Sequence, residues 1–496
     1  MSIQAEYKTI LMQAGETSFK KQLNLFDSIA IVVGSMIGSG IFIVSADIAR
    51  VVGSPFYLLL TWFITGLLTI IAALSYGELA AMMPKAGGQY IYLKEAYNSL
   101  VGFLYGWTLF LVIQTGTIAA VAVAFAKFSG VLIPALSEKN ILFEIAGLKI
   151  SAAQLLAITS ILILTIINYR GIKNGKIMQV SFTITKIVAL GGLIVLGFIA
   201  ASGQGFWHAN FTDMWSASTT VMNKENAVVS IHQLGGIAIF AAIGVAMVGS
   251  VFSSDAWNNV TFIAGEIKNP KRNIPLSLFW GVLLVTVFYI LANIAYLSLL
   301  PLKGSPDSVN ILGRGIQFAA SDRVGVAAAF RIFGDSAAIV MALLIMVSTF
   351  GCNNGLILSG ARVYYAMAND GLFFKEVSRL NKFAVPGVAL VFQCIWASVL
   401  CLSGRYNDLL DYVVFAVLLF YILTIAGLFI LRVKRPDADR PYRAFGYPVL
   451  PALYIVLAIA LCIDLLIYKP NYTWPGVIIV VLGIPVYFLM KRYGRN

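Results

Sequence analysis

Long apolar stretches recur along the chain, separated by short polar segments. A helix that rises 1.5 Å per residue needs about 20 apolar residues to cross roughly 30 Å of hydrocarbon. The pattern predicts twelve spanning helices and an all-α polytopic membrane fold. The expected spans are Ile29–Val44, Phe56–Met83, Leu100–Ala126, Ala152–Asn168, Ile177–Ala201, Leu234–Ala264, Ile274–Leu302, Ala337–Met367, Val385–Leu402, Leu409–Leu431, Val449–Tyr468 and Trp474–Met490.

The first stretch contains three glycines and two serines within Gly34–Phe42, which reads GSMIGSGIF. Glycine costs about 1 kcal/mol relative to alanine inside a helix, and it lets a ligand approach the peptide groups. Peptide groups outside a helix are tolerated at membrane depth where they line a cavity or meet a ligand. The first span is therefore predicted to be a broken helix that carries a binding site.

A second break is predicted in the sixth span, at Gly249–Asn258. Breaks five spans apart are typical of inverted-repeat transporters. We therefore expect a five-plus-five inverted repeat with broken first and sixth helices, plus two extra helices. The corresponding segments are a cytoplasmic N-terminal tail at 1–24, a first repeat at 25–201, an external loop at 202–233, a second repeat at 234–432, and spans 11–12 with a cytoplasmic C-terminus at 433–496.

Composition agrees with a membrane protein: 59% of the 496 residues are hydrophobic, 11% are charged, and the mean hydropathy is +0.87. The net charge of +13 does not indicate nucleic acid binding, because about two thirds of the Lys and Arg residues fall in one alternating set of loops. That bias predicts cytoplasmic termini and a multi-pass protein of the plasma membrane. In the external loop Pro301–Asp335, the apolar segment Val324–Phe333 predicts a short helix, which would serve as a lid or pack on the membrane surface.

Catalytic and metal chemistry find little support in the sequence. The two histidines, His208 and His232, fall in or beside an external loop. The four cysteines fall in predicted spans, where burial as free thiols is expected. No cofactor, metal site or enzymatic activity is expected. A channel is also disfavoured, because two broken helices are not a ring of identical pore residues.

Five segments together resemble the amino acid/polyamine/organocation (APC) superfamily and, within it, the prokaryotic L-type amino acid transporters. They are GSMIGSGIF at Gly34–Phe42, YGELAAMMPKAGGQYIYLKEAY at Tyr76–Tyr97, SSDAWNNVTFIAGEIKNPKRNIPLSL at Ser253–Leu278, STFGCNNGLILSGARVYYAMANDGLF at Ser348–Phe373, and RPYRAFGYPVLP at Arg440–Pro451. Animal L-type transporters pair with a glycoprotein through a cysteine in the loop after the third span. Here that loop, Phe128–Lys149, has no cysteine, so no disulfide-linked heavy subunit is expected.

The resemblance implies a secondary transporter that binds an amino acid between its two broken helices. Backbone N–H groups of Ser39, Gly40 and Ile41 would meet the substrate carboxylate, with carbonyls of Ile37 and Gly38 on the other side. A half-helix N-terminus favours an anion for the same physical reason. The sixth span would line the site and receive the ammonium through carbonyls, using Val251, Phe252, Ser253 and Ser254, with Phe252 closing over the substrate.

Two features of the first and fifth spans have competing interpretations. Gly34 and Gly38 also form a small-xxx-small pattern, so close helix packing competes with binding. Lys186 lies deep in the fifth span, where a charge costs about 2.5–3.5 kcal/mol unless it has a partner; the alternative is a lysine that snorkels. The resemblance gives it a conformational role, with carbonyls of Gly34 or Ile37 and hydroxyls of Ser348 and Thr349 as partners. Burial also disfavours an ammonium, which makes Lys186 a candidate for proton coupling.

Three polar residues are further site candidates. Asp255 is expected to cap the second half-helix of the sixth span, although a carboxylate there could also receive a substrate amine. Gln114 is placed in the pocket from the third span. Asn353 either bonds between helices or lies near the substrate.

The expected function is uptake or exchange of a neutral amino acid by alternating access. The alternative is proton-coupled transport of a cationic amino acid or polyamine, with Asp255 as a ligand.

Overall fold

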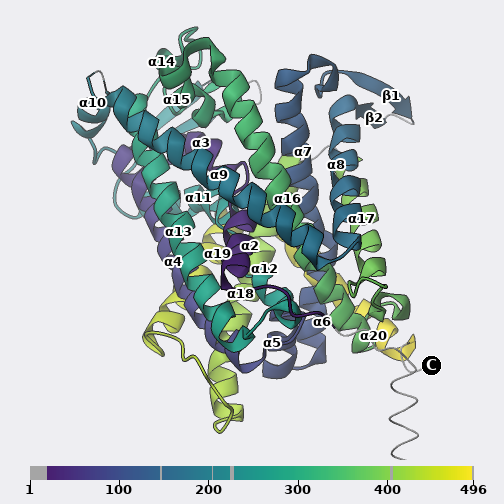
Figure 1. Ribbon diagram of the computed structural model, residues 1–496. Coiled ribbons are helices and arrows are strands. Elements are labelled where there is room, and N and C mark those ends of the chain that lie inside the picture. The colour runs from purple at the N-terminus through teal and green to yellow at the C-terminus, as the bar shows by residue number, and fades with distance from the viewer. Residues whose placement is uncertain (1–18, 146–147, 204, 224–227, 403–405, 494–496) are drawn as a thin grey trace, which may run out of the picture.

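The computed structural model describes residues 19–145, 148–203, 205–223, 228–402 and 406–493 (Figure 1). Residues 1–18, most of the predicted N-terminal tail, lie outside the described residues. Nine helical segments in the described part are long and apolar enough to cross a membrane, and three shorter apolar helices accompany them. The predicted all-helical, multi-span membrane architecture is therefore confirmed.

The long segments are α4 (Pro55–Met82), α6 with α7 (Ser99–Thr108 and Gln114–Leu132), α8 (Ala152–Tyr169), α9 (Ile172–Ala201), α13 (Pro270–Leu299), α15 with α16 (Val324–Phe333 and Ala337–Asn369), α18 (Tyr406–Lys434), α19 (Val449–Tyr468) and α20 (Pro470–Tyr493). The three shorter apolar helices are α2 (Leu25–Met36), α11 (Ile237–Ser253) and α17 (Gly387–Leu402). Helix α15 coincides with the short helix predicted from the sequence, which confirms that prediction.

The first apolar stretch forms two helices separated by a break. Asn24 and Asp27 form a capping box that begins α2. The helix ends at Met36, because Ile37 has an extended backbone (φ −76°, ψ 100°). A short 3₁₀ turn at Gly40–Phe42 follows, and the chain resumes as α3 (Ser45–Val52). The break predicted from the glycines is therefore present in the structure.

The sixth apolar stretch is also interrupted, but later than the sequence predicts. Residues from Gly249 to Ser253 are still helical and complete α11, so the predicted start of the break at Gly249 is wrong. The chain then leaves the helix and resumes as the short α12 (Asn259–Phe262). Ala256, with φ +65°, lies in this interval, and a left-handed residue cannot continue a right-handed helix.

Both breaks lie inside the helical bundle. Helix α2 contacts α9, α13 and α16, while α11 contacts α3, α4 and α19. Figure 1 shows α2 and α12 near the centre of the molecule, surrounded by longer helices. We call the end that carries strands β1 (Ile141–Ile145) and β2 (Leu148–Ser151) the hairpin end, and the end that carries α5 (Gln89–Ala96) and the C-terminus of α20 the tail end.

Three local features differ from the sequence predictions. The loops contain two antiparallel hairpins, β1–β2 and β3 (Ser218–Met222) with β4 (Val228–Gln233). The third span is interrupted by a π-helical turn at Leu109–Ile113, a feature frequent at functional sites. Residues 19–24 are not a free tail, because Leu23 is fully buried and pairs with Ile267.

Candidate functional site

The C-terminal end of α2 presents carbonyl groups that are all engaged by side chains from neighbouring helices. Five successive carbonyls accept such bonds: Gly34 from Lys186 Nζ at 2.8 Å, Ser35 from Cys352 Sγ at 2.9 Å, Met36 from the Tyr289 hydroxyl at 3.1 Å, Ile37 from Lys186 Nζ at 2.7 Å, and Gly38 from Ser348 Oγ at 2.9 Å. The acceptors exposed by the break are therefore satisfied within the protein.

The backbone N–H donors at the first break, unlike its carbonyls, are largely without partners among the described residues. Within the described residues, the backbone N–H groups of Gly38, Ser39, Gly40 and Ile41 have no acceptor, and the first N–H to find one belongs to Phe42. Gly38 and Ser39 precede the 3₁₀ turn, Gly40 and Ile41 begin it, and all four lie before α3, whose N-terminus is the positive end of the helix dipole. Unpaired donors inside a bundle are costly unless a ligand accepts from them. The break is therefore suited to an anionic group.

Lys186 lies at the C-terminus of α2, where a cation interacts favourably with the helix dipole. Its side chain is buried, with 1% of its surface exposed. Besides the carbonyls of Gly34 and Ile37, its ammonium donates to the carbonyl of Ser348 at 3.0 Å. A boundary lysine that snorkels to the surface is thereby excluded.

The predicted hydroxyl partners of Lys186 are wrong. Ser348 Oγ donates to carbonyls of the first break, and Thr349 Oγ1 donates to its own helix at Ile345, 2.7 Å away. Hydroxyl groups on a helix readily bond to the carbonyl four residues earlier. The ammonium therefore bonds to carbonyl groups alone among the described residues.

The two breaks touch each other. A Cβ atom placed on Gly40 would lie 2.7 Å from Ser253 Cβ, so the absence of a side chain permits this contact. The Tyr289 hydroxyl from α13 lies between the carbonyls of Met36 and Ser253, at 3.1 and 3.0 Å. Tyr289 thus ties α2 and α11 together directly beside both breaks.

The three glycines of the first break have different surroundings. Gly34 lies against Gln179 and Thr183 of α9, which supports the packing interpretation at that position. Gly40 is predicted to serve substrate access, but it lies against Ser253, so packing of one break on the other also accounts for it. Gly38 has room, since an added Cβ would be 3.6 Å from Cys352 Sγ.

A cavity of about 680 Å³ reaches the breaks from the hairpin end. Ser39 and Gly40 of the first break and Phe252 of the second line it together, as the sequence predicts for a shared site. Its outer walls come from α7, α8, the end of α17 and the loop before α15. The remaining predicted residues do not line it: Ile37 and Ile41 are buried, whereas Val251 and Ser254 line a smaller cavity beside α4 and α19.

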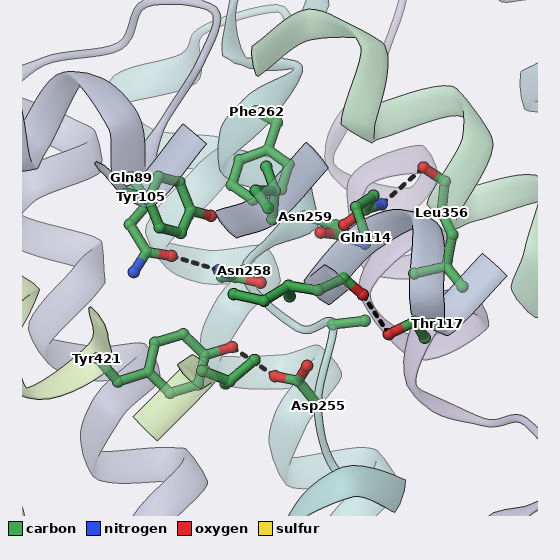
Figure 2. Close-up of a pocket in the computed structure, with 14 residues that line it drawn as sticks. Gln89, Tyr105, Gln114, Thr117, Asp255, Asn258, Asn259, Phe262, Leu356 and Tyr421 are labelled. Carbon is green, nitrogen blue, oxygen red and sulfur yellow. Dashed lines mark hydrogen bonds between the residues drawn. The ribbon is translucent and has the colours of Figure 1, made fainter. Parts of the chain in front are cut away.

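A small polar cavity lies beyond the second break (Figure 2). Its volume of about 20 Å³ is close to that of one water probe. Gln114 lines it and donates to the Leu356 carbonyl at 2.7 Å. Tyr105 Oη and Asn259 Nδ2 also belong to residues of its wall, and both atoms are buried without a hydrogen-bond partner in the described part of the chain.

Asp255 is not a helix cap, so that prediction is wrong. Helix α12 begins at Asn259, its capping position is Asn258, and no side chain caps it. The Asp255 carboxylate instead accepts from the Tyr421 hydroxyl of α18 at 2.5 Å (Figure 2). The left-handed Ala256 separates Asp255 from the helix that it was expected to cap.

Asn353 and its neighbour Asn354 have different environments. Both amide atoms of Asn353 are buried without a hydrogen-bond partner among the described residues. Asn354 bonds to Asn168, at 2.9 Å, and to Gln179, at 2.8 Å, as expected of interhelical bonding. The structure does not bring Asn353 to the cavity at the two breaks.

At the tail end the breaks are covered by charged side chains and backbone bonds. Arg362 of α16 and Glu266, each with a side chain 1% exposed, form two bonds at 2.9 and 3.2 Å. The Glu266 carbonyl accepts the N–H groups of Gln22 and Leu23, at 2.9 and 3.0 Å, and Lys268 N–H donates to the Leu23 carbonyl at 2.8 Å. We call this set of bonds the tail-end seal.

A second group of charges lies near the tail end. Glu78 is buried, and its carboxylate accepts hydrogen bonds from Arg432 at 2.7 Å and from the Ala444 N–H at 2.7 Å. It also forms an ion pair with Arg440, whose Nε lies 3.3 Å from Glu78 Oε1. Glu78 belongs to Tyr76–Tyr97, one of the five segments that resemble the APC superfamily. The two breaks are therefore covered at the tail end and are reached by the cavity at the hairpin end.

Several contributors to this site were not predicted. Tyr289 and Tyr421 lie within long apolar runs of the sequence. The hydrophobic pattern does not distinguish a tyrosine that only packs in the core from one that bonds to residues of the breaks. Cys352 was assigned only to burial, yet its thiol donates to the Ser35 carbonyl. Across the part of the chain that the structure covers, no group of His, Cys, Asp and Glu could hold a metal ion.

Comparison with known proteins agrees with this arrangement. Residues 23–489 match the family described as amino acid permease. The chain is 30% identical over 477 residues to the human large neutral amino acids transporter small subunit 2, covering 96% of this chain and 81% of the relative. It is 27% identical over 484 residues to the serine/threonine exchanger SteT of Bacillus subtilis (strain 168), covering 97% and 99%.

A third relative, the mouse b(0,+)-type amino acid transporter 1, is 29% identical over 485 residues, covering 96% of this chain and 89% of the relative. The match to the family extends over nearly the whole chain and includes both breaks. The chain therefore belongs to the amino acid permeases of the APC superfamily, a family of transporters and not of enzymes.

Proposed function

We propose that this protein exchanges neutral amino acids by alternating access, with the substrate held between the two breaks. One observation carries the proposal: four N–H donors of the first break have no acceptor within the described ranges of the chain. The second break offers unpaired acceptors, because among the described residues no donor reaches the carbonyls of Ser254 and Asp255. An amino acid zwitterion needs donors for its carboxylate and acceptors for its ammonium.

In this proposal the carboxylate binds at Ser39, Gly40 and Ile41, and Phe252 covers the substrate. The cavity at the hairpin end is the entry route, and the tail-end seal closes the exit. Gly34, Ile37 and Ser348 are joined through Lys186, which is a conformational element and not a substrate ligand. Two relatives carry names that specify neutral amino acids or exchange, which supports the same class of substrate.

The proposal also includes a topology. Twelve spans form a five-plus-five inverted repeat with two extra helices, the hairpin end is external, and both termini are cytoplasmic. Val309, 99% exposed at the hairpin end, and Val433, 82% exposed at the end of α18, provide the test. In whole cells a membrane-impermeant thiol reagent should label Val309→Cys and spare Val433→Cys. Labelling of Val433→Cys alone would invert the topology.

Transport itself is tested with purified protein in liposomes. Uptake of labelled L-serine or L-leucine should require unlabelled amino acid inside and should not respond to an inward proton gradient. Decarboxylated analogues should compete poorly, since they lack the group that the first break binds. Uptake without internal amino acid that follows the proton gradient would replace exchange by symport.

A second candidate function is supported by the polar cavity beyond the second break. Asp255 supplies a carboxylate there, and Gln89, Asn258 and Tyr421 add polar atoms (Figure 2). This environment suits the amine of a cationic amino acid or polyamine. Lysine or putrescine that competed with leucine at equal concentration, and lost this ability in Asp255→Asn, would make the cationic substrate the better assignment.

A further inference from the structure

Arg323 lies in the cavity at the hairpin end, and its guanidinium has no acidic partner among the residues that the structure describes. It directly precedes α15 and lines the same cavity as Ser39, Gly40 and Phe252. Its Cζ lies 4.9 Å from the centre of the Phe128 ring, and its Nε is buried without a hydrogen-bond partner in the part of the chain that the structure describes. Within the described residues, no carboxylate lies within ion-pair distance of this arginine.

The backbone next to Arg323 is held in an unusual conformation. Ser321 and Asp322 have φ values of +54° and +60°, a region that costs non-glycine residues energy and is often found at functional sites. Asp322 is fixed by Arg50 of α3 at 2.6 Å, and Arg50 also donates to the Gln317 carbonyl at 2.8 Å. The loop that carries Arg323 is thus anchored to the second half of the first broken helix.

The charges around the cavity leave a positive excess. Of the acidic side chains that line it, Asp322 is paired with Arg50, and Glu138 lies 3.9 Å from Lys127. Arg323 and Lys149 are the lining cations without an ion pair in the described part of the chain. A cleft lined by one sign of charge concentrates ligands of the opposite sign.

Burial affects Arg323 without removing its charge. Desolvation lowers the pKa of its guanidinium, and the Glu138 carboxylate offsets only part of this effect. Arginine nevertheless stays protonated at neutral pH. A planar guanidinium matches a carboxylate through two parallel bonds, and an aromatic ring beneath it fixes its plane.

We propose that Arg323 forms an outer carboxylate subsite, which captures an incoming amino acid in the cavity before its carboxylate moves to the free N–H groups of the first break. This inference rests on the proposed function, because it gives the same substrate an earlier binding site in the cavity that leads to the breaks. The subsite serves entry from the hairpin end only, since Arg323 is not part of the tail-end seal.

The first test compares the half-saturation concentration for substrate at the two ends of the molecule. In liposomes that contain purified protein, Arg323→Gln should raise the half-saturation concentration for L-serine or L-leucine at the hairpin end about five- to tenfold, as expected for loss of a charge-assisted carboxylate contact. The maximal rate and the half-saturation concentration at the tail end should not change. Arg323→Lys should recover part of the affinity, because it restores the charge but not the planar fork.

Lys303→Gln is the matched control, since Lys303 is an exposed cation at the hairpin end that does not line the cavity. It should leave both half-saturation concentrations unchanged. An unchanged value at the hairpin end for Arg323→Gln would overturn the subsite. An equal increase at both ends would also overturn it, since that result describes general damage to the protein.

A second test does not depend on transport. Phenylglyoxal modifies arginine side chains, and its rate at Arg323 can be followed by peptide mass spectrometry of the intact protein after reaction. Propionate, L-serine and L-leucine should slow the reaction at Arg323, whereas isoamylamine, the decarboxylated form of leucine, should not. The exposed Arg272 at the tail end reports any general effect of the additives.

The two tests separate failure of the subsite from failure of the proposed function. Wild-type protein that exchanges amino acids while Arg323 reacts at the same rate with and without carboxylates would refute the subsite alone. Wild-type protein that does not transport amino acids would refute the proposed function, and protection by propionate would still decide whether Arg323 binds a carboxylate.

Discussion

Replacement of Lys186 by methionine should slow transport strongly without abolishing substrate binding. Methionine has nearly the same length, so packing is kept while three hydrogen bonds from the ammonium are lost. The three carbonyls are not equally affected. Ile37 keeps Ser348 Oγ at 3.2 Å, and the Ser348 carbonyl belongs to the interior of α16, whereas Gly34 loses the donor that the structure gives it.

The magnitude follows from this difference. A buried carbonyl without a partner costs about 1–3 kcal/mol, and methionine regains part of this because an ammonium no longer has to be desolvated. A net loss of about 1–2 kcal/mol for the state with a closed tail end shifts its population roughly 5- to 30-fold. Turnover should fall by a similar factor, since α2, α9 and α16 are no longer tied together.

The assay is exchange of labelled L-leucine in liposomes, together with thermal unfolding of the purified protein with and without substrate. Lys186→Met should lose turnover but still gain thermal stability from substrate. Lys173→Met is the matched control, because Lys173 is an exposed lysine on the same helix. Wild-type turnover by Lys186→Met would refute the reasoning and leave the lysine without a role in the cycle.

Three further predictions concern the two breaks. Tyr289→Phe keeps the ring but removes both bonds of its hydroxyl, and should lower the free energy of unfolding by about 1–3 kcal/mol in a denaturation measurement; an unchanged value would mean that the bridge is not needed. Gly40→Ala should impair folding, measured as monodisperse yield, because its Cβ meets Ser253, and Ser253→Gly should restore the yield; a normal single variant would contradict the observed contact. Asp255→Asn should keep neutral amino acid exchange, because the amide still accepts from Tyr421; in the uptake assay, loss of leucine exchange would instead give this carboxylate a direct part in the neutral cycle.

The sequence carries enough information for the position of the first break and for the presence of a second one. Several glycines and serines close together in an apolar stretch weaken a helix at membrane depth, where freed peptide groups need a cavity or a ligand, so the first break could be placed closely. Local composition and the polarity of the surroundings determine this outcome. The carbonyls of Gly34 or Ile37 were expected as partners of Lys186 from the resemblance to the APC superfamily, and both accept from its ammonium in the structure.

Other features depend on contacts that no local pattern contains. The interval between α11 and α12 contains a left-handed alanine at position 256, a conformation that is unfavourable for an L-residue of this type and that no local pattern predicts. The pairing of Glu266 with Arg362 joins residues 96 positions apart. Arg323 appears in the sequence as one of many loop cations, and only its place in the cavity distinguishes it.

The tail-end seal has a consequence for the temperature dependence of transport. Glu266 takes part in it twice, through its side chain with Arg362 and through its backbone with Gln22 and Leu23. Opening the tail end breaks both sets of bonds, and the buried charges lose their partners before water replaces them. Release toward the tail end should have a higher activation enthalpy than entry from the hairpin end, which an Arrhenius comparison of the two directions would measure. On cooling, the transporter would accumulate in the state whose binding site faces the hairpin end, because substrate still binds there while its release toward the tail end becomes slow.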